Sequence, residues 1–164
     1  MNNLIVEGEG FGSVDYVHQC LIDKDKALAF ETAIKEVMRS SYQVLEVGTG
    51  TGILSLIACR AGAKKVTAIE FDPVIADIAR ENIKQNGYED TVTILTADAR
   101  NITFPDNQKF DVVIMEMLCT GLIEEMQVQA INNLISQDII CPPPQHCNSG
   151  CTGKLYRSCS DRFF

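Results

Sequence analysis

The chain has 164 residues, 46% of them hydrophobic and 22% charged, a composition typical of one packed globular domain. It contains no apolar run of about 18 residues or more, and no basic flank precedes an apolar stretch near its start. We therefore expect neither a membrane span nor a signal peptide, and we predict a cytoplasmic protein with no membrane partner. The formal net charge of −8 disfavours unaided binding of nucleic acid without excluding it, and it suits a cationic substrate.

Seven cysteines would suit a disulfide-bonded secreted domain, but three of them lie in segments patterned like a cytosolic α/β protein: Cys20, Cys59 and Cys119. We expect these thiols to be reduced. The two histidines, His18 and His146, lie outside the patterned core, so no histidine base is expected there.

The predicted elements begin with a glycine-rich arm over residues 1–22, which is either mobile or a lid over a substrate site. Residues 23–39 place apolar side chains at helical spacing, which predicts an amphipathic helix. From residue 42 to residue 140, short apolar runs alternate with helical patterns, as in strand and helix units wound into a parallel sheet. The predicted strands are residues 43–47, 65–69, 91–95 and 110–115, and the predicted helices are residues 53–61, 73–85 and 122–135.

These patterns predict an α/β fold, with a Rossmann-like, doubly wound, mostly parallel sheet in one domain over residues 23–140. No strand pattern follows residue 140, so we expect the sheet to lack its C-terminal strands. An incomplete sheet has an unpaired edge that can recruit a second copy, which makes a homo-oligomer one expected partner arrangement.

Residues 141–164 differ from everything before them, because they have no periodic apolar pattern and contain four cysteines. We interpret them as an irregular cysteine-rich tail, either unstructured or of non-native sequence. A small zinc site is the alternative, although its spacings are irregular; its ligands would come from Cys141, His146, Cys147, Cys151 and Cys159. No metal site is expected in the domain itself.

The segment VLEVGTGTGILS, residues 44–55, carries glycines at the junction of a predicted strand and helix. Glycine tolerates the dihedral angles of a sharp turn and lets a ligand lie against the backbone near a helix N-terminus. Dinucleotide enzymes have G-x-G-x-x-G at this place, whereas Ile53 replaces the last glycine here, which favours another nucleotide. The residues expected to contact that nucleotide are Gly48, Thr49, Gly50 and Gly52.

Three acids follow or end the predicted strands. Glu46 can accept from the ammonium group of a methionine moiety, directly or through water, or it is an ordinary solvated strand-end charge. Glu70, at the tip of the second strand, can accept both hydroxyls of a ribose, and Phe71 can lie against an adenine face. Asp98 is placed to accept from the adenine amino group, and Ala99 to offer its backbone amide to the ring. Open parallel sheets bind ligands outside the carboxyl ends of their strands, where all five residues fall.

The motifs of residues 23–140 resemble those of class I S-adenosylmethionine (SAM)-dependent methyltransferases, with EVGTGTG and Glu70 as the specific marks. Within that superfamily, the segments GTGILS, AGAKKVTAIE and FDVVIME are similar to those of protein arginine methyltransferases. The resemblance implies the class I methyltransferase fold and SAM as the cofactor.

The resemblance also implies roles for three further residues. Lys26 matches the family's arginine that pairs with the methionine carboxylate, and it carries the charge without the bidentate fork. Glu116 and Glu125 reproduce the nine-position spacing of the family's catalytic glutamates, which hold a guanidinium and aim one nitrogen at the methyl group. Glu125 also fits a structural role, as an acid in the first turn of a helix. The family's tryptophan, glycine and tyrosine between the two glutamates are replaced here.

We therefore predict a SAM-dependent methyltransferase that transfers a methyl group to a nitrogen or oxygen of an unidentified acceptor, which is a protein, an RNA or a small molecule. The alternative is a SAM-binding or partner-binding module without activity of its own. A nicotinamide dehydrogenase is a third hypothesis, which the glycine spacing disfavours.

Overall fold

The computed structural model describes residue 18, residues 20–106, 108–117 and 127–140, and the backbone of residues 154–157. Its centre is a parallel sheet made of β1 (Gln43–Val47), β2 (Lys65–Glu70), β3 (Val92–Thr96), β4 (Val112–Met115) and β5 (Lys154–Arg157). The strands lie in the order β3-β2-β1-β4-β5, and every pairing is parallel. These are the first five positions of the doubly wound nucleotide-binding fold, so the predicted fold class is confirmed.

The strands form where the sequence is apolar on both faces of the sheet. All of β4 and all but the first residue of β1 are buried, as expected for central strands covered by helices on both sides. β3, at the edge, includes exposed threonines. The predicted bounds of the first four strands agree with the structure to within two residues.

The helices whose bounds the structure describes surround the sheet: α2 (Lys24–Val37), α3 (Ile53–Arg60), α4 (Pro73–Gln85) and α5 (Gln127–Ser136). The carboxylate of Asp23 accepts from a backbone amide at the start of α2, and that of Asp72 does so at the start of α4, where Pro73 takes the first position. The first part of the last predicted helix, residues 122–126, lies outside the described residues.

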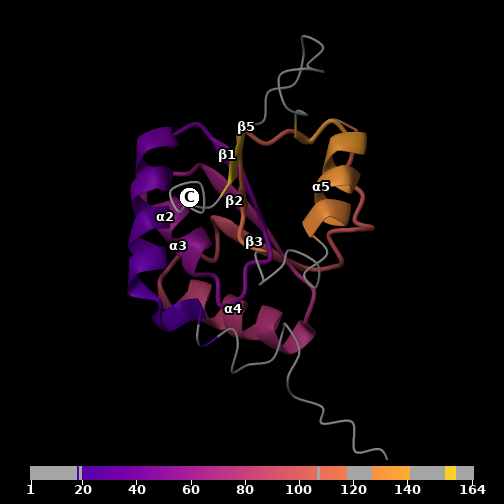
Figure 1. Ribbon diagram of the computed structural model, residues 1–164. Coiled ribbons are helices and arrows are strands. Elements are labelled where there is room, and N and C mark those ends of the chain that lie inside the picture. The colour runs from indigo at the N-terminus through magenta and orange to yellow at the C-terminus, as the bar shows by residue number, and fades with distance from the viewer. Residues whose placement is uncertain (1–17, 19, 107, 118–126, 141–153, 158–164) are drawn as a thin grey trace, which may run out of the picture.

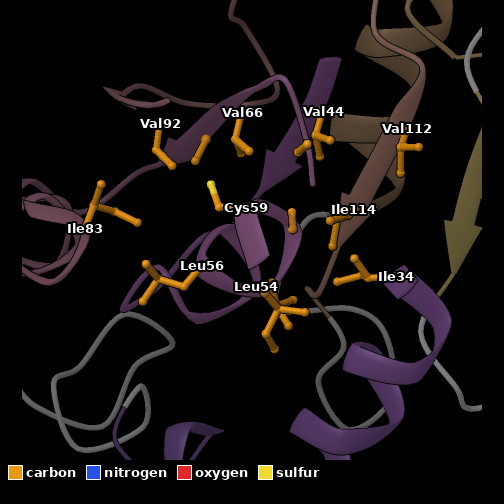
Figure 2. Packing of buried hydrophobic residues seen from close by; sticks show 14 of the residues in the cluster. Ile34, Val44, Leu54, Leu56, Cys59, Val66, Ile83, Val92, Val112 and Ile114 are labelled. Atoms are coloured by element: carbon orange, nitrogen blue, oxygen red, sulfur yellow. The ribbon is translucent and has the colours of Figure 1, made fainter. Parts of the chain in front are cut away.

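Helices cover both faces of the sheet. α2, α3 and α4 pack on one face and α5 on the other (Figure 1). Figure 2 shows the core of the first face, in which Val44 of β1 and Ile114 of β4 meet Leu54 of α3 and Ile34 of α2. Successive residues of a strand point to opposite faces, so Glu46 shares the α3 face with Val44.

One strand follows residue 140, contrary to the expectation for the cysteine-rich tail. Residues 154–157 pair with β4, with Lys154 opposite Val112 and Arg157 opposite Met115. The sequence of this strand, KLYR, begins and ends with a charged residue and lacks the apolar run that marks β4, so the sequence shows no strand pattern there. The free edge of β4 explains the pairing, since its backbone groups need hydrogen-bond partners. No strand beyond β5 occurs in the described part of the chain.

The other expectations for the two ends of the chain stay predictions. The cysteines and His146 of the tail, and residues 1–17 of the arm, lie outside the described residues. Cys20 and Cys59 are free thiols, as predicted. Among the helices that the structure describes, none has the length and hydrophobicity needed to cross a bilayer.

Candidate functional site

The candidate site lies at the carboxyl end of the sheet, where the loops after neighbouring strands meet. β1 lies between β2 and β4, so the loop that begins at Gly48 is flanked by Glu70 at the end of β2 and by Glu116 just beyond β4. Ligands of open parallel sheets bind at this end. The fold therefore brings the predicted nucleotide residues and one predicted acceptor residue around a single loop.

The loop leaves β1 through glycines that adopt left-handed backbone angles. The φ values of Gly48, Gly50 and Gly52 are 75°, 55° and 86°, a region that side chains with a Cβ rarely adopt. The amides of Gly48 and Thr49 both donate to the carbonyl of Ile69 at 3.0 Å, which ties the loop to β2. A Cβ added to Gly52 would make only an ordinary contact, 3.5 Å from a side chain of α4, so the backbone angle and not the space requires glycine there. The prediction that this turn needs glycine is confirmed.

Glu70 points its carboxylate toward the glycine loop. Oε2 accepts from the amide of Gly50 at 2.9 Å, and Oε1 accepts from the amides of Phe71 at 2.8 Å and Asp72 at 3.0 Å. A carboxylate offers about four acceptor positions, two on each oxygen. One position on Oε2 therefore stays available beside the loop, where a ribose hydroxyl can be accepted. The ring of Phe71 next to it is 68% exposed and available for stacking.

Glu46 is fully buried, with 0% of its surface exposed. Its Oε2 accepts from the hydroxyl of Ser55 on α3. Burial raises the pKa of Glu46 to about 8; the hydroxyls of Ser55 and Thr49 oppose this, and the charge of Glu70 adds to it. The interpretation of Glu46 as a solvated strand-end charge is therefore wrong. Its contact with the ammonium group of a cofactor stays a prediction.

Asp98, predicted to accept from an adenine amino group, is held by its neighbour Arg100. The guanidinium donates from Nε to Oδ1 at 2.9 Å and from Nη2 to Oδ2 at 2.6 Å, and the backbone amide of Arg100 donates to Oδ1 at 2.9 Å. The hydrogen bonds from Arg100 lower the pKa of Asp98, which keeps it ionised at neutral pH. Its contact with adenine stays a prediction, and it requires Arg100 to give up part of this pairing.

The loop after β3 is fixed by polar side chains of α5 and of the turn that follows it. Asn133 Nδ2 donates to the carbonyls of Ala99 and Ile102, both at 2.9 Å, and Gln137 Nε2 donates to Ile102 at 2.9 Å. Carbonyls of an irregular loop need such partners, because no ladder of a helix or strand supplies them. These two amides therefore set the position of Asp98 and Ala99 relative to the sheet.

Asn133→Ala should weaken SAM binding although Asn133 is not expected to touch the cofactor. The change removes the donor to two loop carbonyls, which costs about 1–3 kcal/mol for buried groups, so we expect about a tenfold lower affinity in calorimetry. Gln85→Ala on α4 is the matched control, because this exposed amide donates only to Glu81 in the described structure. Equal affinities in the two variants would contradict the bracing role of Asn133.

Lys26 on α2 and Glu116 beyond β4 form an ion pair beside the glycine loop. Lys26 Nζ lies 3.6 Å from Glu116 Oε1, with 31% and 22% of the two side chains exposed. Burial is the largest single effect on Lys26 and lowers its pKa, but Glu116, Cys20 and Asp23 together outweigh it, so the pKa is raised. The carbonyl oxygen of Glu116 would lie 3.3 Å from a Cβ on Gly48. A predicted cofactor residue, a predicted catalytic acid and the loop are thus in contact.

The second predicted glutamate, Glu125, lies outside the described residues, so its catalytic role and its structural alternative both stay predictions. Sequence reasoning missed three residues that shape the site. Ser55 had a signal, since it stands one helical turn after the glycines and its side chain must face the strands. Arg100 and Asn133 gave little signal in the sequence. An arginine near an acid is common, and the hydrogen-bond partners of Asn133 lie 31 and 34 positions away from it.

Comparison with known proteins places this site in a family. The family model of ribosomal protein L11 methyltransferase (PrmA) matches residues 28–140. An uncharacterized protein of Methanocaldococcus jannaschii is 42% identical over 123 residues, which are 75% of this chain and 46% of that protein. The ribosomal protein L11 methyltransferase of Staphylococcus saprophyticus is 35% identical over 124 residues, which are 69% of this chain and 38% of that protein. The chain therefore spans less than half the length of these relatives.

Solved structures of protein arginine methyltransferases have the same fold. The Trypanosoma brucei PRMT1 enzyme–prozyme heterotetrameric complex with AdoHcy matches with a TM-score of 0.64 and 31% identity, over 72% of this chain and 37% of that chain. Arabidopsis thaliana protein arginine methyltransferase 10 matches with the same TM-score and identity, over 76% of this chain and 35% of that chain. The predicted resemblance to this group is confirmed.

Proposed function

The chain belongs to the ribosomal protein L11 methyltransferase (PrmA) family, and from this membership we propose that it transfers a methyl group from SAM to a protein side chain. The predicted class I SAM-dependent methyltransferase family, with SAM as its cofactor, is confirmed. The names of the Staphylococcus saprophyticus relative and of the Arabidopsis thaliana structural neighbour each specify a protein as the substrate. Of the acceptors predicted from the sequence, a protein is therefore the one we choose.

The observation that carries the proposal is the contact between Glu116 and the glycine loop. The loop and Glu70 would hold the nucleoside of SAM, and Phe71, Asp98 and Ala99 would lie at its adenine. The residues of this site suit SAM, because Glu70 keeps one acceptor position toward the glycine loop and Phe71 is exposed beside it. When bound, SAM supplies an electrophilic methyl group.

The acceptor end of the site is acidic and close to the loop. Lys26 would pair with the carboxylate of the cofactor, and Glu116 would hold the acceptor by a charge-assisted hydrogen bond. Methyl transfer depends on aligning the nucleophile behind the methyl group more than on acid or base strength. A nitrogen that carries an N–H fits Glu116 better than an oxygen, and the net charge of −8 favours a basic protein as its carrier.

The test combines binding with transfer. The 164-residue chain is titrated with SAM and with NAD, and is then incubated with methyl-labelled SAM and ribosomal proteins or arginine-containing peptides. We expect SAM to bind and the label to enter protein. Binding of NAD without SAM would overturn the proposal. SAM binding without label in any acceptor would support the alternative, a module without activity, which the short span of the chain relative to its relatives keeps as the second candidate.

Glu116→Gln should slow methyl transfer and leave SAM affinity almost unchanged. A charge-assisted hydrogen bond to the acceptor is worth about 1.5–3 kcal/mol, so we expect about a ten- to hundredfold lower kcat/KM for the acceptor. SAM affinity should change by less than about threefold, because the ion pair that Lys26 loses is partly exposed and its charges are 3.6 Å apart. Glu36→Gln, on the exposed face of α2, is the control. An unchanged transfer rate would remove Glu116 from the mechanism.

Two further statements belong to the proposal. A cytoplasmic location is supported by the free thiols of Cys20 and Cys59, which suit a reducing compartment. A homo-oligomer is supported by β3, an edge strand of the described sheet whose outer backbone groups can pair with another copy.

A further inference from the structure

We propose that Glu46 is a positioning residue that carries a proton and uses it to hold the glycine loop in the shape that receives the cofactor. This inference rests on the proposed function, since it concerns the same cofactor site. It begins from two buried polar atoms without hydrogen-bond partners among the described residues, Glu46 Oε1 and Thr49 Oγ1. Their residues are 0% and 3% exposed.

One proton supplies a partner for both atoms. A protonated Oε1 is a donor, and the hydroxyl oxygen of Thr49 can accept from it; the same hydroxyl, by donating to an ionised Oε1, lowers the pKa of Glu46. With Oε2 accepting from Ser55, the neutral carboxyl group then bridges α3 and the turn after Gly48. Buried polar atoms are nearly always paired in folded proteins, so these two oxygens share a hydrogen bond in either protonation state, and the surroundings of Glu46 decide which state it takes.

The surroundings of Glu46 favour the neutral form. Its neighbours across the sheet are Ala68 on β2 and Ile114 on β4, both apolar. A buried carboxylate without a cation is costly, and such groups take up a proton instead. Two cations at this end of the sheet are taken up by other acids: Lys26 pairs with Glu116, and Arg100 pairs with Asp98.

The titratable groups that face Glu46 are not cations either. Cys59 of α3, shown facing the strands in Figure 2, has its pKa raised to about 11 by burial and by Glu46. Glu70, at the end of β2, is acidic and favours the protonated form of Glu46. With the pKa of Glu46 at about 8, most molecules carry the proton at neutral pH.

The inference fixes the sign of a pH dependence. Raising the pH through about 8 ionises Glu46, so that Oε1 can then only accept from Thr49 and a charge is left buried beside the loop. The resulting charge draws water between β1 and α3, so the loop loosens and SAM affinity falls. If an ionised Glu46 instead accepted the ammonium group of the cofactor, the affinity would rise over the same range.

Glu46→Gln separates these outcomes. The glutamine amide accepts through its oxygen and donates through its nitrogen, so it reproduces the protonated acid and cannot ionise. SAM affinity is measured by calorimetry in both proteins from about pH 6.5 to about pH 9.5. We expect equal affinities at the lower end and a fall of about tenfold or more for the parent chain relative to Glu46→Gln at the upper end. The amino group of SAM titrates equally in both measurements, so their ratio reports Glu46 alone.

Two results would overturn the inference. One is a SAM affinity of the parent chain that rises with pH relative to that of Glu46→Gln, and the other is a lower SAM affinity of Glu46→Gln at neutral pH.

A second measurement, of folding stability, does not need the cofactor. The folded pKa of about 8 exceeds the ordinary value of 4.5, so the parent chain loses stability relative to Glu46→Gln as the pH rises between these values and loses no more above them. Failure of SAM binding at every pH would overturn the proposed function, and this stability difference would still test the proton on Glu46.

Discussion

Glu70→Ala is expected to lower SAM affinity about a hundredfold or more. Three backbone amides lose their acceptor, among them the amide of Gly50, whose bond to Oε2 fixes the glycine loop against β2. The acceptor position for a ribose hydroxyl disappears with them. A hydrogen bond to a charged group contributes about 1.5–3 kcal/mol, so the loss of the ribose contact alone accounts for a large part of the effect.

Calorimetry with SAM checks this result, with Asp77→Ala as the matched control. Asp77 is an acid on α4 whose side chain is 78% exposed and pairs with Arg80, so its removal should leave SAM affinity unchanged. Denaturation by urea in both variants shows whether the fold persists. An affinity within about threefold of the parent chain in folded Glu70→Ala would remove the ribose contact from the site.

The fold was predictable because its signals are local. β1 and α4 occupy the predicted residues, since each combines an apolar period with a clear boundary, such as Pro73 after Asp72. The position of Glu70 was predictable for the same reason, because a parallel sheet places every strand end at one edge. The direction in which its carboxylate points, toward Gly50, follows from that placement and from the bare amides of the loop.

The unpredicted parts of the site depend on tertiary contacts. The bracing by Asn133 joins residues more than 30 positions apart. One of the two interpretations of Glu46 placed it in solvent, but α3 covers it completely, and burial raises its pKa. Such effects require the packing of one element on another, which a sequence pattern indicates only in outline.

Gly48→Ala should impair both the fold and methyl transfer, because Gly48 is the point where the glycine loop touches Glu116, the residue just beyond β4 that is proposed to hold the acceptor. An alanine Cβ would lie 3.0 Å from Met117 Cγ and 3.3 Å from the carbonyl oxygen of Glu116, at a φ of +75°. The methionine side chain can move aside, but the carbonyl belongs to the backbone. The loop and Glu116 must therefore separate, which misplaces the acceptor relative to the methyl group.

Gly62→Ala is the control that isolates this contact. Gly62 has a φ of +97°, and an added Cβ would meet nothing within 4 Å, so alanine there pays only for the backbone angle, about 1–2 kcal/mol. Gly48→Ala should cost about 1–3 kcal/mol more in urea unfolding and should lower the single-turnover transfer rate about a hundredfold, since small misplacements of reacting groups have effects of that size. If both variants lose the same stability and transfer at the same rate, the contact between Gly48 and Glu116 does not position the acceptor, and the two halves of the site act independently.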